Sequence, residues 1–142
     1  MGLFLFNNSI DTILARQFTL NKNERLKSRK IIEQLFKEGK AFNLPPFRVY
    51  YLFESKNVSL QFGTGVSTRN FKKAVDRNRI KRLIREAWRL QKLPLKEMVK
   101  EQNTPLSVFI IYTAKELPVY KDISGRMEKT ISKLSSLIAP KQ

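Results

Sequence analysis

The segment from Arg69 to Lys92 limits how this chain can fold more than any other, because its side chains separate into two faces when it is wound as an α-helix. At about 100° per residue, one arc of roughly 140° holds cations and an amide, with Trp88 as the exception, and the opposite arc is apolar. The charged arc comprises Arg77, Asn78, Lys81, Arg82, Arg85 and Arg89, and the apolar arc comprises Ile80, Leu83, Ile84, Ala87 and Leu90. This pattern predicts a helix that packs on a core with one face and displays cations on the other. Trp88 falls among the cations, and we expect it to pack beneath arginine stems rather than stack with a base.

The same segment carries half of the net charge of the chain. It holds ten basic and two acidic side chains, against a formal net charge of +16 for all 142 residues. Like charges spaced four apart, as in Arg77, Lys81 and Arg85, repel by about a few tenths of a kcal/mol each. Phosphate groups offset such repulsion, and each neutralised phosphate also releases counterions. We therefore expect a nucleic acid as the partner.

Composition narrows the class of protein. A chain of 142 residues fits one domain, and 42% hydrophobic residues are too many for a disordered basic tail. The absence of Cys and His excludes disulfides, thiolate nucleophiles, imidazole bases and the usual zinc sites. No apolar run approaches the roughly 18–20 residues of a membrane-spanning helix, and the apolar Met1–Phe6 is too short for a signal peptide. We expect a soluble, cytoplasmic protein with no membrane partner.

Hydrophobic periodicity and turn residues place the secondary structure. The expected elements are a helix from Asn23 to Gly39, a strand Phe47–Glu54 after Pro45-Pro46, a hairpin turn at 55–57, a strand Ser59–Ser67, the basic helix 69–92 with a further turn or two at 95–99, a buried strand Leu106–Thr113 and a helix of about 121–138. Residues 1–22 are interpreted as an extension and 139–142 as a tail. The order indicates an α+β domain around one small sheet.

Two strands suggest a groove for RNA bases. Tyr50 stands beside Arg48, and Gly63 with Gly65 leave one face of the neighbouring strand nearly bare. Bare glycines admit a ligand, a bulge or a packed helix, and ordinary cross-strand packing explains Tyr50 equally well. Unstacked RNA bases suit such a surface, whereas the sequence shows neither a second helix for a helix-turn-helix nor a zipper heptad for DNA.

The string Val75-Asp-Arg-Asn-Arg-Ile-Lys-Arg-Leu-Ile-Arg-Glu-Ala-Trp-Arg89 resembles the Arg-Asn-Arg signature helix of the bacterial ribonuclease P protein subunit. The likeness extends to Arg25-Leu26-Lys27 before a helix that ends at Gly39, to the aromatic strand from Phe47, and to Gly63-x-Gly65-Val66-Ser67 just before the basic segment. It covers about residues 23–138, although Thr68–Lys73 fits the pattern loosely, by about one residue.

The resemblance implies a fold and a function. The fold is a single αβββαβα domain with a mostly four-stranded sheet, an extra short strand near residues 40–42 and a left-handed crossover through the signature helix, against the usual right-handed rule. The function is that of a ribonucleoprotein subunit. Its catalytic RNA removes the 5′ leader of precursor tRNA with Mg²⁺ bound mainly by that RNA. The catalytic groups are expected in the RNA and not in this chain, and we assign no metal ligand to this chain.

The resemblance also implies two sets of binding residues. Those for the catalytic RNA are Arg77, Asn78, Arg79, Lys81, Arg82, Arg85 and Arg89, and those for the leader cleft are Ile32, Phe36, Arg48, Tyr50 and Leu52. Ile32 stands where the family commonly has an aromatic residue. Arg48 stands where a small aliphatic residue is common, so it exchanges an apolar contact for a phosphate contact.

Two other classes stay open. A ribosome-associated or general RNA-chaperone protein has similar charge but binds many RNAs equally and stimulates no leader cleavage. A metal-dependent nuclease needs clustered carboxylates, whereas Asp11, Asp76 and Asp122 stand apart in the sequence with no paired acidic motif.

Overall fold

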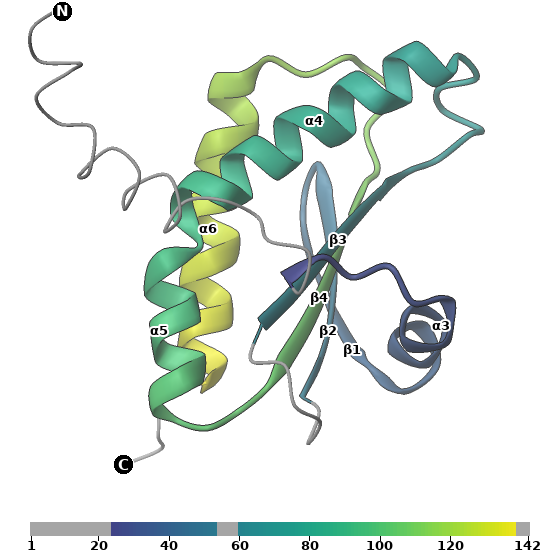
Figure 1. The fold of residues 1–142 in the computed structure, drawn as a ribbon. Coiled ribbons are helices and arrows are strands. Elements are labelled where there is room, and N and C mark those ends of the chain that lie inside the picture. The colour runs from purple at the N-terminus through teal and green to yellow at the C-terminus, as the bar shows by residue number, and fades with distance from the viewer. Residues whose placement is uncertain (1–23, 54–59, 139–142) are drawn as a thin grey trace, which may run out of the picture.

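The computed structural model describes residues 24–53 and 60–138 (Figure 1). Its elements in chain order are α3 (Arg29–Glu38), β1 (Lys40–Leu44), β2 (Phe47–Phe53), β3 (Leu60–Val66), α4 (Ala74–Gln91), α5 (Leu93–Glu101), β4 (Leu106–Tyr112) and α6 (Tyr120–Ile138). The α+β class and the expected order are confirmed, with α5 as an additional helix and β1 as the short extra strand. The predicted extension 1–22, the residue Asn23 and the tail 139–142 lie outside the described residues.

The four strands form one mixed sheet in the order β1-β2-β4-β3. β4 pairs antiparallel with β2 and parallel with β3, so the expected buried strand is indeed internal. The predicted hairpin between the second and third strands is wrong, because β4 lies between them, and the turn residues 55–57 fall outside the described residues. Burial explains the order: β4 is mostly apolar and buried and takes the centre, whereas β3, with its two glycines, takes the edge.

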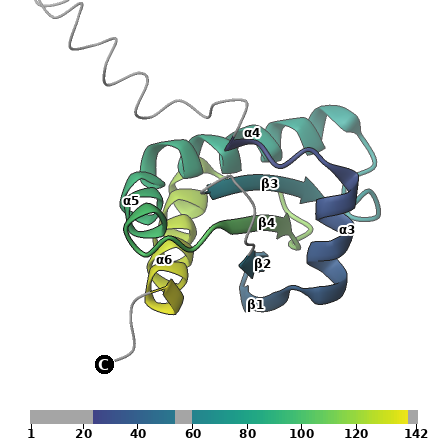
Figure 2. The same ribbon diagram turned by 60° about the horizontal axis from the view of Figure 1, so that its bottom comes forward.

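One face of the sheet forms the core with α4, α5 and α6, and α3 lies on the other side (Figure 1). Figure 2 shows α4 running alongside β3 at the edge of the sheet. From the strands the core takes Phe47, Val49, Tyr51, Leu60, Phe62, Leu106, Val108, Ile110 and Tyr112. The expected stripe of the last helix is buried throughout and comprises Ile123, Met127, Ile131, Leu134 and Ile138. Within the described ranges, no helix has the length and apolarity to cross a membrane.

The first helix begins later than its periodicity predicts. It starts at Arg29, and Leu26 lies in an extended segment whose backbone N–H donates to the Phe62 carbonyl at 2.8 Å. Arg25 forms an isolated parallel bridge with Phe62. No described strand pairs with the outer edge of β3, and the 25–26 segment covers part of that edge. The basic helix is also shorter than expected, because residues 68–70 form a turn and α4 starts at Ala74.

Candidate nucleic-acid interface

The basic helix α4 lies on the core with a rotation that differs from the predicted one. Its buried residues are Ile80, Ile84, Ala87 and Trp88. On the helical wheel this sector is turned by about 40–50° from the predicted apolar arc. Trp88 is 1% exposed and stacks on Phe62 with ring centroids 4.2 Å apart, whereas Leu90 is left 43% exposed. The packing role expected for Trp88 is thus confirmed, and its large ring decides the rotation of the helix.

This rotation gives Arg77 a structural role. Its Nη1 donates to the carbonyl of Phe71 at 2.8 Å and to that of Lys72 at 2.7 Å. The guanidinium therefore fixes the loop that leads into α4. Contact of Arg77 with RNA stays a prediction.

The remaining predicted residues of α4 differ in how open they are. Asn78, Arg79, Arg82 and Arg85 are exposed, and Lys81 is half-buried. Arg89 is half-buried and binds Glu86, with Nε donating to Oε2 at 3.1 Å. That hydrogen bond lowers the pKa of Glu86 and raises that of Arg89. A partly exposed pair of this kind stabilises the fold little, and it also reduces what Arg89 offers to an outside anion.

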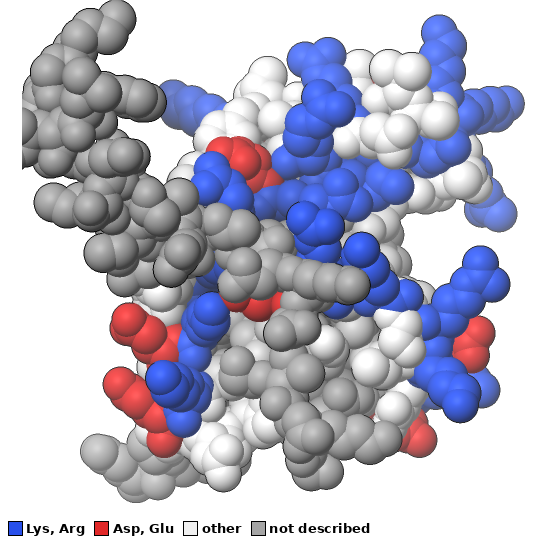
Figure 3. All heavy atoms as spheres, viewed as in Figure 1, with Lys and Arg blue, Asp and Glu red and all other residues white. Residues whose placement is uncertain are grey.

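A groove of about 830 Å³ runs beside α4, with cations on both of its walls. Arg82 and Arg85 come from α4, and Arg25 with Lys27 come from the segment that covers the β3 edge. Among the described residues, the lining of this cationic groove comprises Arg25, Leu26, Lys27, Ile32, Phe62, Gly63, Thr64, Arg82, Arg85, Glu86, Arg89 and Phe109. Figure 3 shows the basic side chains gathered over and below α4, with few acidic ones among them. The wall residues Arg25 and Lys27 were missed as site residues, although they flank the buried Leu26.

The predicted cleft residues Phe36 and Tyr50 meet on the second face of the sheet. Their ring centroids lie 4.8 Å apart, and Phe36 also contacts Phe109 of β4, edge to face, at 5.5 Å. We call Phe36, Tyr50 and Phe109 the aromatic cluster. Phe36 remains 44% exposed, so part of its ring is open to a ligand. Leu52 is half-buried on the same face of β2, and Ile32 lines the cationic groove rather than the cluster.

Phe109 also explains the bare face of β3. Gly63 and Gly65 do not lie next to Tyr50, because Phe109 stands between Tyr50 and Gly63 in the strand register. A Cβ added at Gly63 would lie 2.8 Å from the Phe109 ring, and one at Gly65 would lie 3.2 Å from it. The glycines therefore make room for an aromatic ring of this chain. Because Phe109 also lines the cationic groove, the two predicted sets of site residues adjoin on one surface.

A buried ion cluster holds the segment that forms one wall of the groove. Lys92 is fully buried and binds Glu24, which also accepts from Lys96 Nζ at 2.8 Å. Burial alone would raise the pKa of Glu24, but the bonds from the two lysines outweigh it and hold that pKa below its ordinary value. Burial also lowers the pKa of Lys92, against the effect of Glu24. The cluster ties the start of the described chain to the junction of α4 and α5.

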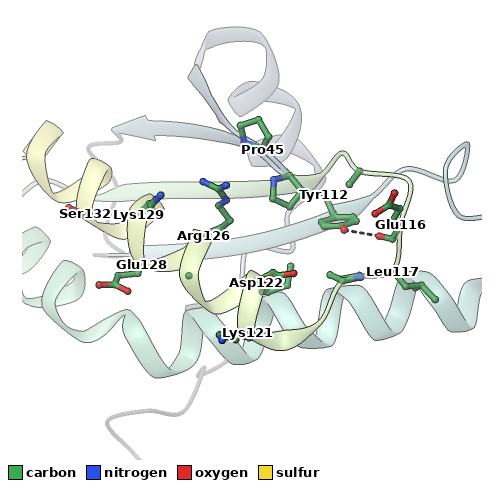
Figure 4. A pocket seen from close by; sticks show the side chains of 15 residues that line it. Pro45, Tyr112, Glu116, Leu117, Lys121, Asp122, Arg126, Glu128, Lys129 and Ser132 are labelled. Atoms are coloured by element: carbon green, nitrogen blue, oxygen red, sulfur yellow. Dashed lines mark hydrogen bonds between the residues drawn. The ribbon is translucent and has the colours of Figure 1, made fainter.

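A second hollow, of about 860 Å³, lies between α6, the Pro45-Pro46 turn and the 113–119 loop (Figure 4). Acidic and basic side chains both line it, among them Asp122 and Arg126. The Tyr112 hydroxyl donates to the Glu116 carbonyl at 2.7 Å, and burial raises the pKa of Tyr112. None of the predicted site residues lies in this hollow, and its mixed charge shows no preference for a polyanion.

In residues 24–53 and 60–138, no three acidic side chains come together in a group that could hold a metal ion. We derive no step through a metal on this chain.

Comparison with known proteins agrees with the geometry. The family model described as ribonuclease P matches residues 20–135. A protein of Porphyromonas gingivalis named ribonuclease P protein component is 35% identical over 120 residues, which cover 83% of this chain and 88% of that protein. One of the same name from Clostridium kluyveri is 33% identical over 109 residues, 77% of this chain and 92% of its own. The fold matches the solved structure of the Staphylococcus aureus RNase P protein with a TM-score of 0.61 at 23% identity, over 82% of this chain and 98% of that one.

Proposed function

Because this chain belongs to the ribonuclease P protein family, whose members are protein subunits of the tRNA-processing ribonucleoprotein ribonuclease P, we propose that it binds both the catalytic RNA and the 5′ leader of precursor tRNA. The cations of α4 contact the catalytic RNA. The cationic groove and the aromatic cluster hold the single-stranded leader. The particle works in the cytoplasm, without a membrane or DNA partner.

The open cations of α4 support the contact with the catalytic RNA. Among the described residues, no carboxylate pairs with Arg79, Arg82 or Arg85. Their guanidinium groups are exposed and present planar forks of N–H donors that match phosphate oxygens. Asn78 adds an amide on the same open part of the helix. An RNA backbone laid along α4 replaces the repulsion among these cations by attraction.

The aromatic cluster supports the contact with the leader. A base of single-stranded RNA stacks on an exposed aromatic ring, and such stacking contributes about 1–3 kcal/mol per base. Phe36 offers its open ring while Tyr50 and Phe109 hold it edge to face. Ile32, with no π face, supplies only an apolar contact. The single observation that carries the proposal is that this cluster adjoins, through Phe109, a groove with cations on both walls.

The chain contributes electrostatics and positioning rather than a reacting group. Mg²⁺ bound mainly by the catalytic RNA would supply the Lewis-acid chemistry of leader removal. Arg25, Lys27, Arg82 and Arg85 reduce the repulsion between the leader and the catalytic RNA, since both strands carry phosphates. The protein therefore raises substrate affinity and lowers the metal concentration that the RNA requires.

Reconstitution tests this proposal. Cleavage of precursor tRNA by the cognate RNA is measured at low Mg²⁺ with and without the full chain. We expect clear stimulation by the protein, because its cations replace part of the screening by Mg²⁺. No stimulation, together with equal binding to unrelated RNAs, would instead indicate a general RNA-chaperone protein.

A further inference from the structure

Three side chains at the β1–β2 edge form a hydrogen-bonded chain beside the aromatic cluster. Arg48 Nε donates to the Tyr50 hydroxyl oxygen at 2.7 Å, and Arg48 Nη1 donates to Asn43 Oδ1 at 3.1 Å. The Arg48 guanidinium carbon also lies 5.1 Å from the Tyr50 ring centroid. Asn43 and Arg48 face each other across the register of β1 and β2. The strand pairing thus holds all three groups in one place.

The direction of these bonds determines what the three groups can still bind. A guanidinium has five N–H donors and no acceptor, so Tyr50 and Asn43 must both accept from it. The Tyr50 hydroxyl then has its own proton left to donate. Asn43 uses its oxygen for Arg48 and keeps its NH₂ group for a partner. All three side chains therefore present donors to the surroundings.

The set is also positively charged and lacks a counter-ion in the described part of the chain. No carboxylate in these ranges pairs with Arg48. Nucleobase edges carry both donors and acceptors and no net charge, whereas a phosphodiester carries acceptors only and a negative charge. The complementary ligand is therefore a phosphate group. Tyr50 contacts Phe36, so this phosphate lies next to the ring on which a base would stack.

We propose that Asn43, Arg48 and Tyr50 bind one phosphodiester of the leader, one step along the strand from the nucleotide that stacks on Phe36. This phosphate site rests on the proposed function, because the leader must lie on the aromatic cluster for the site to be filled. Asn43 orients the guanidinium with its oxygen and donates to the phosphate from its NH₂ group, and Tyr50 and Arg48 make the other contacts with the phosphate.

A scan of neutral linkages tests the site in the assembled particle. Single leader phosphates of precursor tRNA are replaced by methylphosphonate, and affinity is measured for the holoenzyme with wild-type chain, Arg48→Met and Tyr50→Phe. We expect one linkage at which neutralisation weakens wild-type binding about tenfold, because the phosphate there no longer accepts charge-assisted hydrogen bonds. For the Arg48→Met holoenzyme, neutralisation of that same linkage should lower the affinity hardly at all, because this variant has already lost the contact. Tyr50→Phe keeps the aromatic ring and removes one donor. Neutralisation of that linkage should therefore lower its affinity less than in wild type but more than in Arg48→Met.

The control is Arg126→Met on α6, a half-buried arginine outside the site. Any change in binding free energy that Arg126→Met causes should add to the change caused by a methylphosphonate at every leader linkage. Strictly additive effects for Arg48→Met and Tyr50→Phe at all leader linkages would overturn the phosphate site while leaving leader binding intact. If precursor and mature tRNA bind the wild-type holoenzyme equally, leader binding itself fails, and the phosphate site fails with it.

Discussion

Gly63 and Phe109 show how a single pair of residues shapes the proposed binding surface. The ring of Phe109 occupies the space that a Cβ at Gly63 would need, and the Leu26 carbonyl lies 3.2 Å from the same point. The ring is also in contact with Phe36, so any shift of Phe109 disturbs the aromatic cluster. Both the fold and the site therefore depend on a glycine at this position.

The Gly63→Ala variant tests this dependence. It should lower the free energy of unfolding by about 1–3 kcal/mol, because the added methyl group overpacks against a ring and a backbone carbonyl. Urea denaturation of the full chain measures the decrease. The matched control is Gly125→Ala on α6, where nothing lies within 4 Å of the added Cβ and the free energy of unfolding should rise by about 0.5–1 kcal/mol. Equal effects of the two variants would contradict the close approach of Phe109.

At the scale of elements, the buried ion cluster connects the segment before α3 to the junction of α4 and α5. Glu24 is the shared acceptor of Lys92 and Lys96, and Lys92 is fully buried. Removing a carboxylate from such a cluster takes a counter-ion away from a buried ammonium group. The position of Arg25 and Lys27 at the groove depends on the same anchor.

Glu24→Gln should lower the free energy of unfolding at neutral pH by about 3–5 kcal/mol. The pKa of Glu24 is lowered in the folded state, so its contribution is present above the ordinary value of 4.5 and is lost as pH falls through the lower folded pKa. Denaturation midpoints measured from pH 7 down to strong acid should therefore converge for wild type and variant. Glu97→Gln, at an exposed position of α5, should change little. A difference between the midpoints of wild type and Glu24→Gln that stays constant down to strong acid would contradict the ion cluster.

The open face of α4 makes a separate prediction about salt. The double variant Arg82→Met, Arg85→Met should keep the fold and flatten the dependence of RNA affinity on salt, by about 0.7–0.9 in logarithmic slope for each phosphate that is no longer neutralised. Arg77→Met should instead lower stability, since Arg77 binds the carbonyls of Phe71 and Lys72. An unchanged salt slope in the double variant would mean that these cations are merely solvated.

At the scale of the whole molecule, local patterns predicted most elements but not how they pair. The apolar run of β4 correctly indicated a central strand, yet a turn signal between β2 and β3 suggested a hairpin that β4 prevents. Leu26 fitted the helical spacing of α3, but the open edge of β3 draws it into an extended segment. Pairing of distant strands depends on which surfaces are left to cover, and no local window contains that information.

The same limit applies to the site. Phe36, Tyr50 and the open cations of α4 were predicted from their types and their likeness to a family, and the structure brings the two aromatic rings together. Phe109 was missed because a phenylalanine within a continuous apolar strand is typical of core. Only the sheet order shows that it stands between Tyr50 and Gly63 and joins the cluster to the cationic groove.

The dependence of affinity on the leader tests the proposed function most directly. Binding of precursor and mature tRNA is compared for the catalytic RNA alone, for the particle with wild-type chain and for the particle with Phe36→Ala. We predict that the wild-type chain makes the precursor bind at least tenfold more tightly than the mature tRNA, since one stacked base contributes about 1–3 kcal/mol. Phe36→Ala should remove most of that preference, and the RNA alone should show little of it. Equal affinities for precursor and mature tRNA with the wild-type chain present would contradict the proposal.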